Sequence, residues 1–315
     1  MMKGLVVENS KITLKDGLDV PSPKNNEVLV KVVCASINPT DLDIVKGQYD
    51  LFFKLFGGDH LVKTGLEFSG VIEAENTRFK KGDKVFGYVD LIRGLKTHQE
   101  YLAIDEDYIA LMPSNLNFEQ AAALPLGALT TLVALQDLGQ VNKGTEVLIN
   151  GASGGLGVYA IQVAKIFGAR VTAVAGPNQE EFLMNLGSDQ VINYQKSNIK
   201  DLSEKFDILL DLTTNLKFKE IKNILAKNGK FIPTDPLKNM MDLLSNIFGN
   251  KKTRLLYVGQ GNYEKLTQIA HWVEEGKLNT YGDSCFAFSD YEKAFQRLRE
   301  KGKRGRVIIK IGKDK

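Results

Sequence analysis

The stretch Glu146-Val-Leu-Ile-Asn-Gly-Ala-Ser-Gly-Gly-Leu-Gly157 leads directly into the apolar-periodic run 158–167. A short apolar segment therefore ends in a glycine-rich turn that opens a helix, the order found where a pyrophosphate binds at a helix N-terminus. Ala152 replaces the first glycine of the G-x-G-x-x-G fingerprint, so a tight strand-to-helix connection without a ligand is the alternative. Gly168 ends the predicted helix and residues 170–175 have the composition of a strand. Together they complete a βαβ unit, which favours the nucleotide site.

The bulk composition limits the class of protein. The 315 residues are enough for two domains, and 43% hydrophobic with 25% charged residues is typical of a soluble globular protein. A net charge of +3 is too small to indicate a nucleic-acid partner. Cys34 and Cys285 form no disulfide framework, so we expect both to be reduced in a cytoplasmic protein. No signal-peptide pattern precedes the first strand-like run, and the longest uncharged stretch, 120–136, is shorter than the roughly 20 residues of a membrane span.

The pattern of predicted elements changes after the first third of the chain. Short β-rich runs separated by turns come first and are typical of a small antiparallel barrel-like domain. From residue 119 helical and strand patterns alternate, which predicts a doubly wound parallel sheet with its ligand at the carboxyl ends of the strands. We expect strands at 27–34, 70–75, 84–89 and 100–104, and then near 146–150, 170–175, 189–194, 206–212, 229–233 and 254–259.

After a predicted helix at 263–276 the chain is expected to leave the parallel-sheet region. Ser289 and Glu292 have the spacing of a capping box, which predicts a helix over 289–299 followed by Gly302. The final strand, 306–311, could pair with the N-terminal region. We interpret the basic run 301–306 as a solvated helix end and turn rather than a phosphate-binding patch.

Several separate motifs follow one another along the chain. They are Asn38-Pro-Thr-Asp41, Gly65-Leu-Glu67, Lys81-Gly-Asp-Lys-Val-Phe-Gly87, Ala121-Ala-Ala-Leu-Pro125 with Leu129-Thr130, and the turn 151–157. With these motifs in this order, nearly the whole chain resembles the zinc-free medium-chain dehydrogenases/reductases of the quinone oxidoreductase type. Val174-Ala-Gly176 and Phe182 are similar to the enone (alkenal) reductase branch.

The resemblance implies an α/β fold in two domains. One is a Rossmann dinucleotide-binding domain over residues 121–276, with a doubly wound parallel sheet. The other is a GroES-like, mainly-β catalytic domain over residues 1–120, completed by 277–315. The resemblance further implies an NAD(P)H-dependent oxidoreductase, and suggests a homodimer formed through an edge strand near 254–259.

The residues themselves argue against zinc. Zinc-dependent relatives need four closely spaced cysteines for a structural site and cysteine and histidine for a catalytic site. Two cysteines cannot form the structural site, and the resemblance places Asn38, Leu66 and Leu126 at the catalytic ligand positions. Leucine has no lone pair for zinc, so we expect no metal. The three histidines are not at ligand spacing: His60, His98 and His271.

Without zinc, plain carbonyl reduction lacks the Lewis acid that would stabilise an alkoxide. Substrates that delocalise the negative charge themselves are favoured, since an enolate or a hydroquinone anion needs only hydrogen-bond donors near its oxygen. We therefore expect reduction of the C=C bond of α,β-unsaturated ketones or aldehydes, or of quinones. The alternatives are a quinone oxidoreductase proper and a non-catalytic NADPH-binding sensor or structural protein.

The choice of cofactor depends on the end of the second Rossmann strand. NAD-binding units typically place an acidic residue there to bind the ribose 2′-hydroxyl. Here the strand ends at Ala175-Gly176-Pro177-Asn178, and Glu180 and Glu181 come later, on the next helix. The missing acid favours NADPH over NADH. Asn178 could donate to a 2′-phosphate, and Tyr194 matches a family position that helps to hold it, although a packed sheet-end tyrosine is an alternative.

The resemblance also assigns individual residues. The Asn38 amide could donate to the substrate oxygen, although Asn38-Pro39 could simply make a turn. Asp41 could serve the active site or cap the next helix, and Tyr49 could donate a proton or act as a lid, water being an equal proton source. The expected catalytic residues are Asn38, Tyr49 and Asp41. The expected cofactor-binding residues are Thr130 (with helix packing as its alternative), Ser153, Gly154, Gly155, Leu156, Gly157, Gly176, Asn178 and Tyr194.

Overall fold

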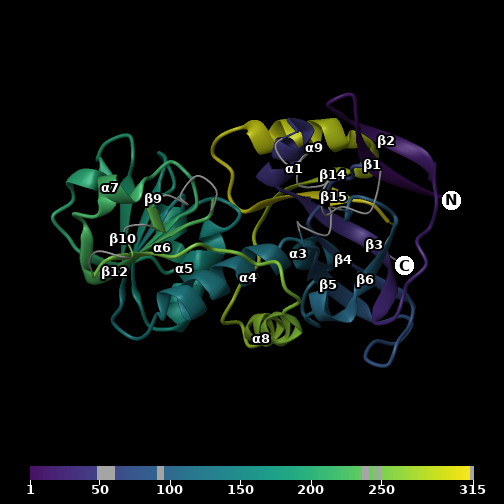
Figure 1. Ribbon diagram of the computed structural model, residues 1–315, viewed down its shortest axis with the longest axis horizontal. Helices are drawn as coiled ribbons and strands as arrows, with labels where there is room; N and C mark the ends of the chain where they lie inside the picture. The colour runs from purple at the N-terminus through teal and green to yellow at the C-terminus, as the bar shows by residue number, and fades with distance from the viewer. Residues whose placement is uncertain (48–60, 91–95, 236–241, 244–245, 247–249, 313–315) are drawn as a thin grey trace. The chain divides into compact units, whose positions relative to one another are not determined.

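A computed structural model describes residues 1–47, 61–90, 96–235, 242–243, 246 and 250–312 (Figure 1). By its internal contacts the chain divides into two compact units. The first comprises Met1–Leu126, Gly259–Gly276 and Thr280–Lys315, and the second comprises Gly127–Val258 and Lys277–Asn279. Tyr49 lies outside the described residues.

The first unit is built on a seven-stranded sheet in the order β14-β15-β3-β4-β5-β7, with β6 also paired to β3. Its pairs are antiparallel except β14 with β15. Val307 lies opposite Ile37, so the predicted pairing of the final strand with the N-terminal region is confirmed (Figure 1). The strands are β3 (Glu27–Ile37), β4 (Glu67–Ala74), β5 (Lys84–Tyr88), β6 (Tyr101–Asp105), β7 (Ile109–Leu111), β14 (Gly282–Ala287) and β15 (Arg306–Lys310).

Strand β3 changes character along its length. Its first half alternates, with Val28 and Val30 buried and Lys31 half-buried, as expected for a sheet with one covered face. From Val32 to Ile37 every residue is buried, because further elements cover the second face. A hairpin of β1 (Met2–Glu8) and β2 (Lys11–Leu18) is one of them, and its apolar residues join a cluster with Ile37 and β15. The chain therefore enters Asn38 from a fully buried strand.

Two helices of the first unit differ from the sequence-based predictions. Helix α8 (Tyr263–Glu274) belongs to this unit, whereas the sequence placed 263–276 in the dinucleotide domain. Ser114 donates to the Glu274 carboxylate through its N–H and its hydroxyl, both at 3.0 Å, which holds the end of α8. Helix α9 (Tyr291–Arg299) begins after a 3₁₀ turn at Phe288–Asp290, so the capping box predicted at Ser289 is wrong. The remaining helical segments are α1 (Pro39–Val45), α3 (Phe118–Ala122) and η1 (Glu106–Tyr108).

The second unit contains a six-stranded sheet in the order β10-β9-β8-β11-β12-β13, with every pair parallel. The strand order reverses between β8 and β11, the arrangement of a doubly wound Rossmann-type sheet, so the predicted fold class is confirmed (Figure 1). The strands are β8 (Glu146–Asn150), β9 (Arg170–Ala175), β10 (Gln190–Asn193), β11 (Phe206–Asp211), β12 (Leu225–Pro233) and β13 (Lys252–Thr253).

The strand predicted at 254–259 is wrong. Strand β13 covers only Lys252–Thr253, and the apolar run after it has no strand pairing. The last backbone bond at this edge joins the Arg254 N–H to the Phe231 carbonyl at 2.8 Å. Strand β12 ends two residues later at Pro233, which has no N–H to extend a ladder. The edge strand expected to form a homodimer is therefore missing from the described structure.

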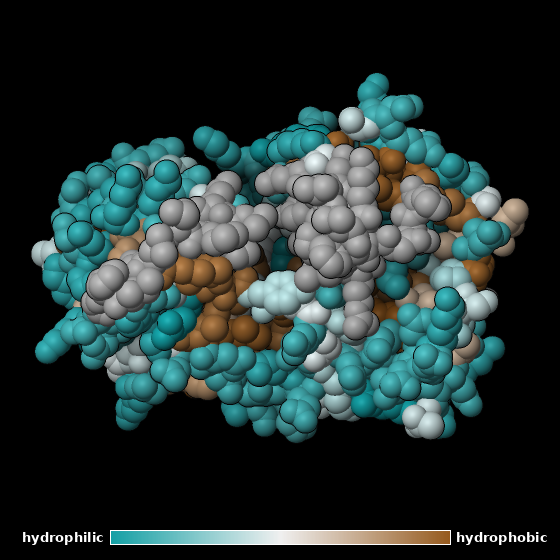
Figure 2. Space-filling model, viewed as in Figure 1, coloured by the Kyte–Doolittle hydropathy of each residue, from teal (hydrophilic) through white to brown (hydrophobic). Residues whose placement is uncertain are grey.

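Helices pack on the parallel sheet, and their apolar residues form its core. α5 (Gly157–Ile166) contains Val158–Ala164, all buried, which explains the nearly continuous apolar run read from the sequence. On the face of the second unit visible in Figure 2, hydrophobic residues gather around the place of α5, and hydrophilic residues lie below them. The other helical segments are α4 (Pro125–Leu132), the π-helix η2 (Val133–Gly139), α6 (Glu180–Asn185), η3 (Ile199–Asp201) and α7 (Phe218–Ile221). Within the described part of the chain, no helix combines the length and hydropathy needed to cross a membrane.

A partly buried ion pair connects β14 with α9. The Arg297 guanidinium donates to both carboxylate oxygens of Asp283 at 2.8 Å, and the Arg304 N–H donates to the same carboxylate at 3.0 Å. Burial acts to raise the pKa of Asp283, but these donors outweigh it and the net pKa is lowered from 3.8. The ionised carboxylate therefore stabilises the fold at neutral pH.

We expect Asp283→Asn to lower the free energy of unfolding by about 2 kcal/mol at pH 7, because a charge-assisted, two-pronged contact is lost. Since the folded-state pKa lies below the unfolded value, this stabilisation is present above that value and is lost as the pH falls through the folded pKa. Urea unfolding of both proteins between pH 7 and pH 3 checks this. A difference that stays constant across the series would contradict it.

Candidate active site and cofactor site

The glycine-rich turn of the second unit follows β8 and leads into α5. Gly151 has φ +87°, and a Cβ on Gly157 would lie 2.4 Å from the Ala152 carbonyl oxygen, so both positions require glycine. Among the described residues, no protein acceptor binds the N–H groups of Gly155, Leu156 and Gly157. These N–H groups stand at a helix N-terminus and can bind an anion. The turn therefore fits a dinucleotide pyrophosphate, and Ser153 and Gly154 lie within it.

A polar contact joins β8 and β11 at the point where the strand order reverses. The Asn150 amide donates to the Asp211 carboxylate and to the Thr213 hydroxyl, both at 2.9 Å. Asp211 is completely buried and also accepts the Leu216 N–H at 3.0 Å. These bonds fix the carboxyl ends of the two strands between which nucleotides bind in such sheets.

The end of β9 meets the end of β10. A Cβ on Gly176 would lie 3.4 Å from the Tyr194 ring and hydroxyl, so the structure brings these two predicted residues together. The Tyr194 side chain is about half exposed (51%), and Asn178 has a left-handed backbone with φ +60°. Glu180 and Glu181 lie in the first turn of α6, beyond the strand end. No acidic residue therefore stands where the ribose 2′-hydroxyl is usually bound.

The predicted Thr130 lies in α4 and is half-buried. Its neighbour Thr131 is fully buried and donates to carbonyl oxygens of its own helix, Gly127 and Ala128, at 3.0 Å. Thr131 therefore packs within the core, whereas Thr130 is only half-buried.

In the first unit, Asp41 joins two loops. Its carboxylate accepts the N–H of Asn38 at 2.8 Å and that of Gly65 at 2.7 Å. Burial raises the pKa of Asp41, and the nearby His98 and the two N–H donors only partly offset this rise. Asp41 thus braces the backbone at the start of α1, and the structure gives it contacts with the loops rather than with an open site.

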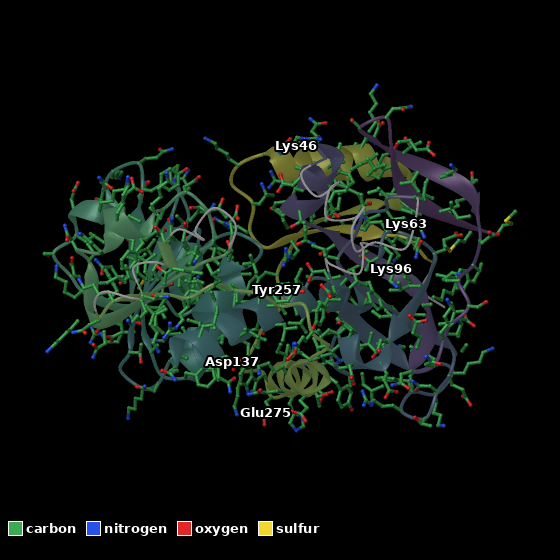
Figure 3. The ribbon with its side chains drawn as sticks, viewed as in Figure 1. Lys46, Lys63, Lys96, Asp137, Tyr257 and Glu275 are labelled. Atoms are coloured by element: carbon green, nitrogen blue, oxygen red, sulfur yellow. The ribbon has the colours of Figure 1, made fainter. Side chains whose placement is uncertain are left out.

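The loop at Gly65 is fixed from its other side. Gly65 has φ +98°, and a Cβ there would lie 2.3 Å from the Thr97 hydroxyl. The N–H groups of Lys96 and Thr97 both donate to the Gly65 carbonyl, and the Lys96 ammonium donates to the Ala103 carbonyl at 2.9 Å. Lys96 is labelled in Figure 3. The segment 64–67 therefore has little freedom.

The Asn38 side chain lies in a buried polar network. Its Nδ2 lies 3.2 Å from Glu67 Oε1 and 3.3 Å from Ser36 Oγ, and its Oδ1 accepts a hydrogen bond from Arg306 Nη1. The Ser36 hydroxyl donates to Glu67 Oε1 at 2.5 Å, and Arg306 Nη2 lies 3.2 Å from the same oxygen. Glu67 Oε2 accepts the Leu126 N–H at 2.8 Å. Asn38, Glu67 and Arg306 are 3%, 0% and 5% exposed, so most of the network is shielded from bulk water.

The residues at the zinc-ligand positions do not suit zinc. Asn38 and Glu67 are already held by Arg306, Leu66 has no donor atom, and Leu126 contributes a backbone N–H. Among the described residues no group of three or more His, Cys, Asp or Glu side chains could hold a metal. His98 Nε2 donates to the Ser36 carbonyl at 2.9 Å, and its Nδ1 forms a hydrogen bond with the Thr64 hydroxyl at 2.8 Å. Both ring nitrogens thus have structural partners.

Sequence reasoning missed Ser36 and Arg306. The run 301–306 was interpreted as solvated, whereas Arg306 is buried, because its strand β15 inserts between β14 and β3. The available signal was the position of Arg306 at the head of an apolar strand. Tyr49, the third predicted catalytic residue, cannot be placed because it lies outside the described residues.

We expect Gly157→Ala to destabilise the unliganded protein, because the added methyl would meet three backbone atoms of Ala152 within 2.5 Å. Gly154→Ala is the matched control, since its Cβ would find only the Gly151 oxygen, at 3.5 Å. Thermal unfolding without ligand should show a lower Tm for Gly157→Ala alone, by several degrees. Equal Tm values for the two variants would show that the turn is not tight at Gly157.

Comparison with known proteins agrees with this architecture. Residues 24–114 match the family described as the alcohol dehydrogenase GroES-like domain, and residues 186–309 match the one described as zinc-binding dehydrogenase. The chain is 30% identical over 305 residues to the chloroplast envelope quinone oxidoreductase homolog of Arabidopsis thaliana, covering 92% of this chain and 91% of that protein. It is 29% identical over 310 residues to the chloroplastic NADPH-dependent alkenal/one oxidoreductase of the same plant, covering 95% and 75%.

Among solved structures, the quinone oxidoreductase from Coxiella burnetii superposes with a TM-score of 0.87 at 26% identity, covering 99% of both chains. The similarity extends over nearly the whole chain and thus over both units. The chain therefore belongs to the medium-chain dehydrogenase/reductase family, among its quinone and alkenal/one oxidoreductases, and is an NAD(P)H-dependent oxidoreductase.

Proposed function

We propose that the protein reduces the C=C bond of α,β-unsaturated ketones or aldehydes, or reduces quinones, by hydride transfer from NADPH without zinc. The observation that carries the proposal is the network of Asn38, Glu67 and Arg306, in which Asn38 stands at a position where the resemblance places a zinc ligand. A network of hydrogen-bond donors suits an anion that is already delocalised, and offers no Lewis acid for a localised alkoxide.

The roles of the residues follow from their contacts. A reduced nicotinamide, when bound, supplies the hydride. The N–H groups of the turn 155–157 bind the pyrophosphate, and the Asn38 amide donates to the substrate oxygen as negative charge develops there. Asp41 holds the backbone of Asn38 and Gly65 in place. Thr130, which is only half-buried, is a further candidate for a cofactor contact.

The preference for NADPH is supported by the end of β9. An acid at this place would repel a 2′-phosphate, and Gly176 and Asn178 stand there instead. Tyr194 faces Gly176 with an exposed hydroxyl that can donate to the phosphate. One relative is named an NADPH-dependent alkenal/one oxidoreductase, which agrees with this choice.

The second candidate is a quinone oxidoreductase proper, favoured by two relatives with that name. A cytoplasmic location and a homodimer stay predictions. The relatives from Arabidopsis are named for the chloroplast, and no strand is described at 254–259 to form the expected dimer edge.

We expect the protein to oxidise NADPH when a short-chain enone is present. With a simple quinone we expect the rate of NADPH oxidation to be no higher than with the enone. The loss of NADPH absorbance at 340 nm, roughly its near-ultraviolet maximum, measures the rate, and typical turnover is about 1–1,000 s⁻¹. Turnover with the quinone alone would favour the second candidate. Tight NADPH binding with no turnover of either substrate would contradict the proposed reaction.

Zinc independence has its own test. We expect elemental analysis to find far less than one zinc per chain, and prolonged dialysis against a chelator to leave turnover unchanged, because the donor atoms are already paired within the protein. One bound zinc per chain, or activity restored by added zinc, would overturn this part of the proposal.

We expect Tyr194→Phe to weaken NADPH binding by about fivefold, because one hydrogen bond of about 1 kcal/mol is lost, and to leave NADH binding unchanged. Titration calorimetry of both proteins with both cofactors checks this. Equal weakening for the two cofactors would mean that Tyr194 does not contact the 2′-phosphate, and equal wild-type affinities would remove the NADPH preference.

A further inference from the structure

We propose that Arg306 and Glu67 are positioning residues that hold the Asn38 carboxamide in one orientation, with one amide N–H fixed inside the network and the other left to donate to the substrate oxygen. The identity of that oxygen rests on the proposed function. The orientation of the carboxamide does not, and it can be tested separately.

The first step is the assignment of the two ends of the carboxamide. Arg306 Nη1 contacts the end named Oδ1, and a guanidinium has five donors and no acceptor. An NH₂ group in that place would put donor against donor. The atom facing Arg306 must therefore be the oxygen, so the other end of Asn38 carries the two N–H bonds.

The second step concerns those two N–H bonds. Their nitrogen lies 3.2 Å from Glu67 Oε1 and 3.3 Å from Ser36 Oγ, and these oxygens lie 2.5 Å from each other. The three distances place the oxygens roughly 45° apart as seen from Nδ2, far less than the ~120° between the two N–H bonds of a planar amide. One N–H therefore serves both oxygens, and the described residues provide no acceptor for the second.

The third step is the rigidity of the network. Glu67 is completely buried and Arg306 is 5% exposed, so either charge alone would be strongly destabilised. Both oxygens of Glu67 are in use, Oε1 by Ser36, Asn38 and the ion pair, and Oε2 by the Leu126 N–H. Glu67 therefore cannot turn to free the amide without leaving a buried group unpaired.

Arg306 is held just as firmly. Its Nε and Nη2 are buried and make no hydrogen bond of good geometry within the described structure, although Nη2 lies 3.2 Å from Glu67 Oε1. Asn38 Oδ1 is therefore its one well-aligned acceptor among the described residues. A rotation of Asn38 would cost Arg306 this bond, which makes the opposite orientation of the amide unfavourable.

The test is a kinetic double-mutant cycle of Asn38→Ala, Arg306→Met and the double variant. We expect each single change to lower kcat about tenfold or more, with a change in KM below about threefold, because the donor acts mainly on the charge that develops during reaction. If Arg306 acts through Asn38, the double variant is no slower than the slower single variant. Losses that multiply in the double variant would overturn the positioning role.

Two further variants separate positioning from simple loss of folding. Arg306→Lys keeps the charge and one donor, so we expect it to fold and to recover part of the lost kcat. Arg170→Met is the matched control, since Arg170 forms an exposed ion pair with Glu146 at 3.2 Å at the start of β9, and we expect unchanged kcat. If Arg306→Lys has the Tm of the wild type but recovers none of the kcat lost in Arg306→Met, the proposal is contradicted.

A measurement independent of turnover tests the orientation itself. With ¹⁵N-labelled asparagine, the Asn38 side-chain signals are identified by their loss in Asn38→Ala. We expect one of the two N–H protons to exchange with water at least about tenfold more slowly than the other, this difference to vanish in Arg306→Met, and part of it to remain in Arg306→Lys. Equal exchange of both protons in the wild type would overturn the inference. If this difference is present but no enone or quinone is turned over, the proposed function fails and the positioning stands.

Discussion

The buried ion pair between Glu67 and Arg306 is the constraint on which the first unit depends. Both charges are buried, so each is stable only because the other is present; the Ser36 hydroxyl, the Asn38 amide and the Leu126 N–H also donate to the Glu67 carboxylate. The pair connects the starts of β4 and β15, and its hydrogen bonds reach the end of β3 and the first turn of α4. Four segments distant in sequence are therefore fixed by one carboxylate and one guanidinium.

The second unit uses a different kind of contact. Its glycine-rich turn presents backbone N–H groups, whose positions are set by the absence of side chains at Gly151 and Gly157. The tie between Asn150 and Asp211 fixes the neighbouring strand ends. A backbone site of this type can bind any pyrophosphate, so a preference for one nicotinamide dinucleotide must come from side chains outside the turn. The network of the first unit, by contrast, is centred on the side chains of Asn38, Glu67 and Arg306.

The parallel sheet was predictable from sequence because its signals are local. Strands β8 and β9 and the turn between β8 and α5 lie within thirty residues, and glycine at 157 is required by an atom only five residues away. The strand predicted at 254–259 was wrong because the prediction used only local composition. The run is apolar like a strand, but the neighbouring strand β12 ends at Pro233 and offers it no pairing partner. Arg306 was not predictable, because its burial results from the pairing of β15 with β3, and no local pattern records that pairing. The sequence motifs identified Asn38 and Asp41 as candidate site residues. They did not predict the contacts that these two residues make with residues distant in the sequence.

The separation of 268 residues between Asn38 and Arg306 bears on how the protein is made. The ribosome synthesises the β3 segment long before the β15 segment. Until β15 is made, the Glu67 carboxylate, which is buried in the folded protein, has no Arg306 to pair with. The sheet of the second unit has all its strands available before that moment. During synthesis the parallel sheet with its glycine-rich turn can therefore be complete while the network around Glu67 is not. A chain shortened before β15 would keep that sheet but lack the arginine that pairs with Glu67.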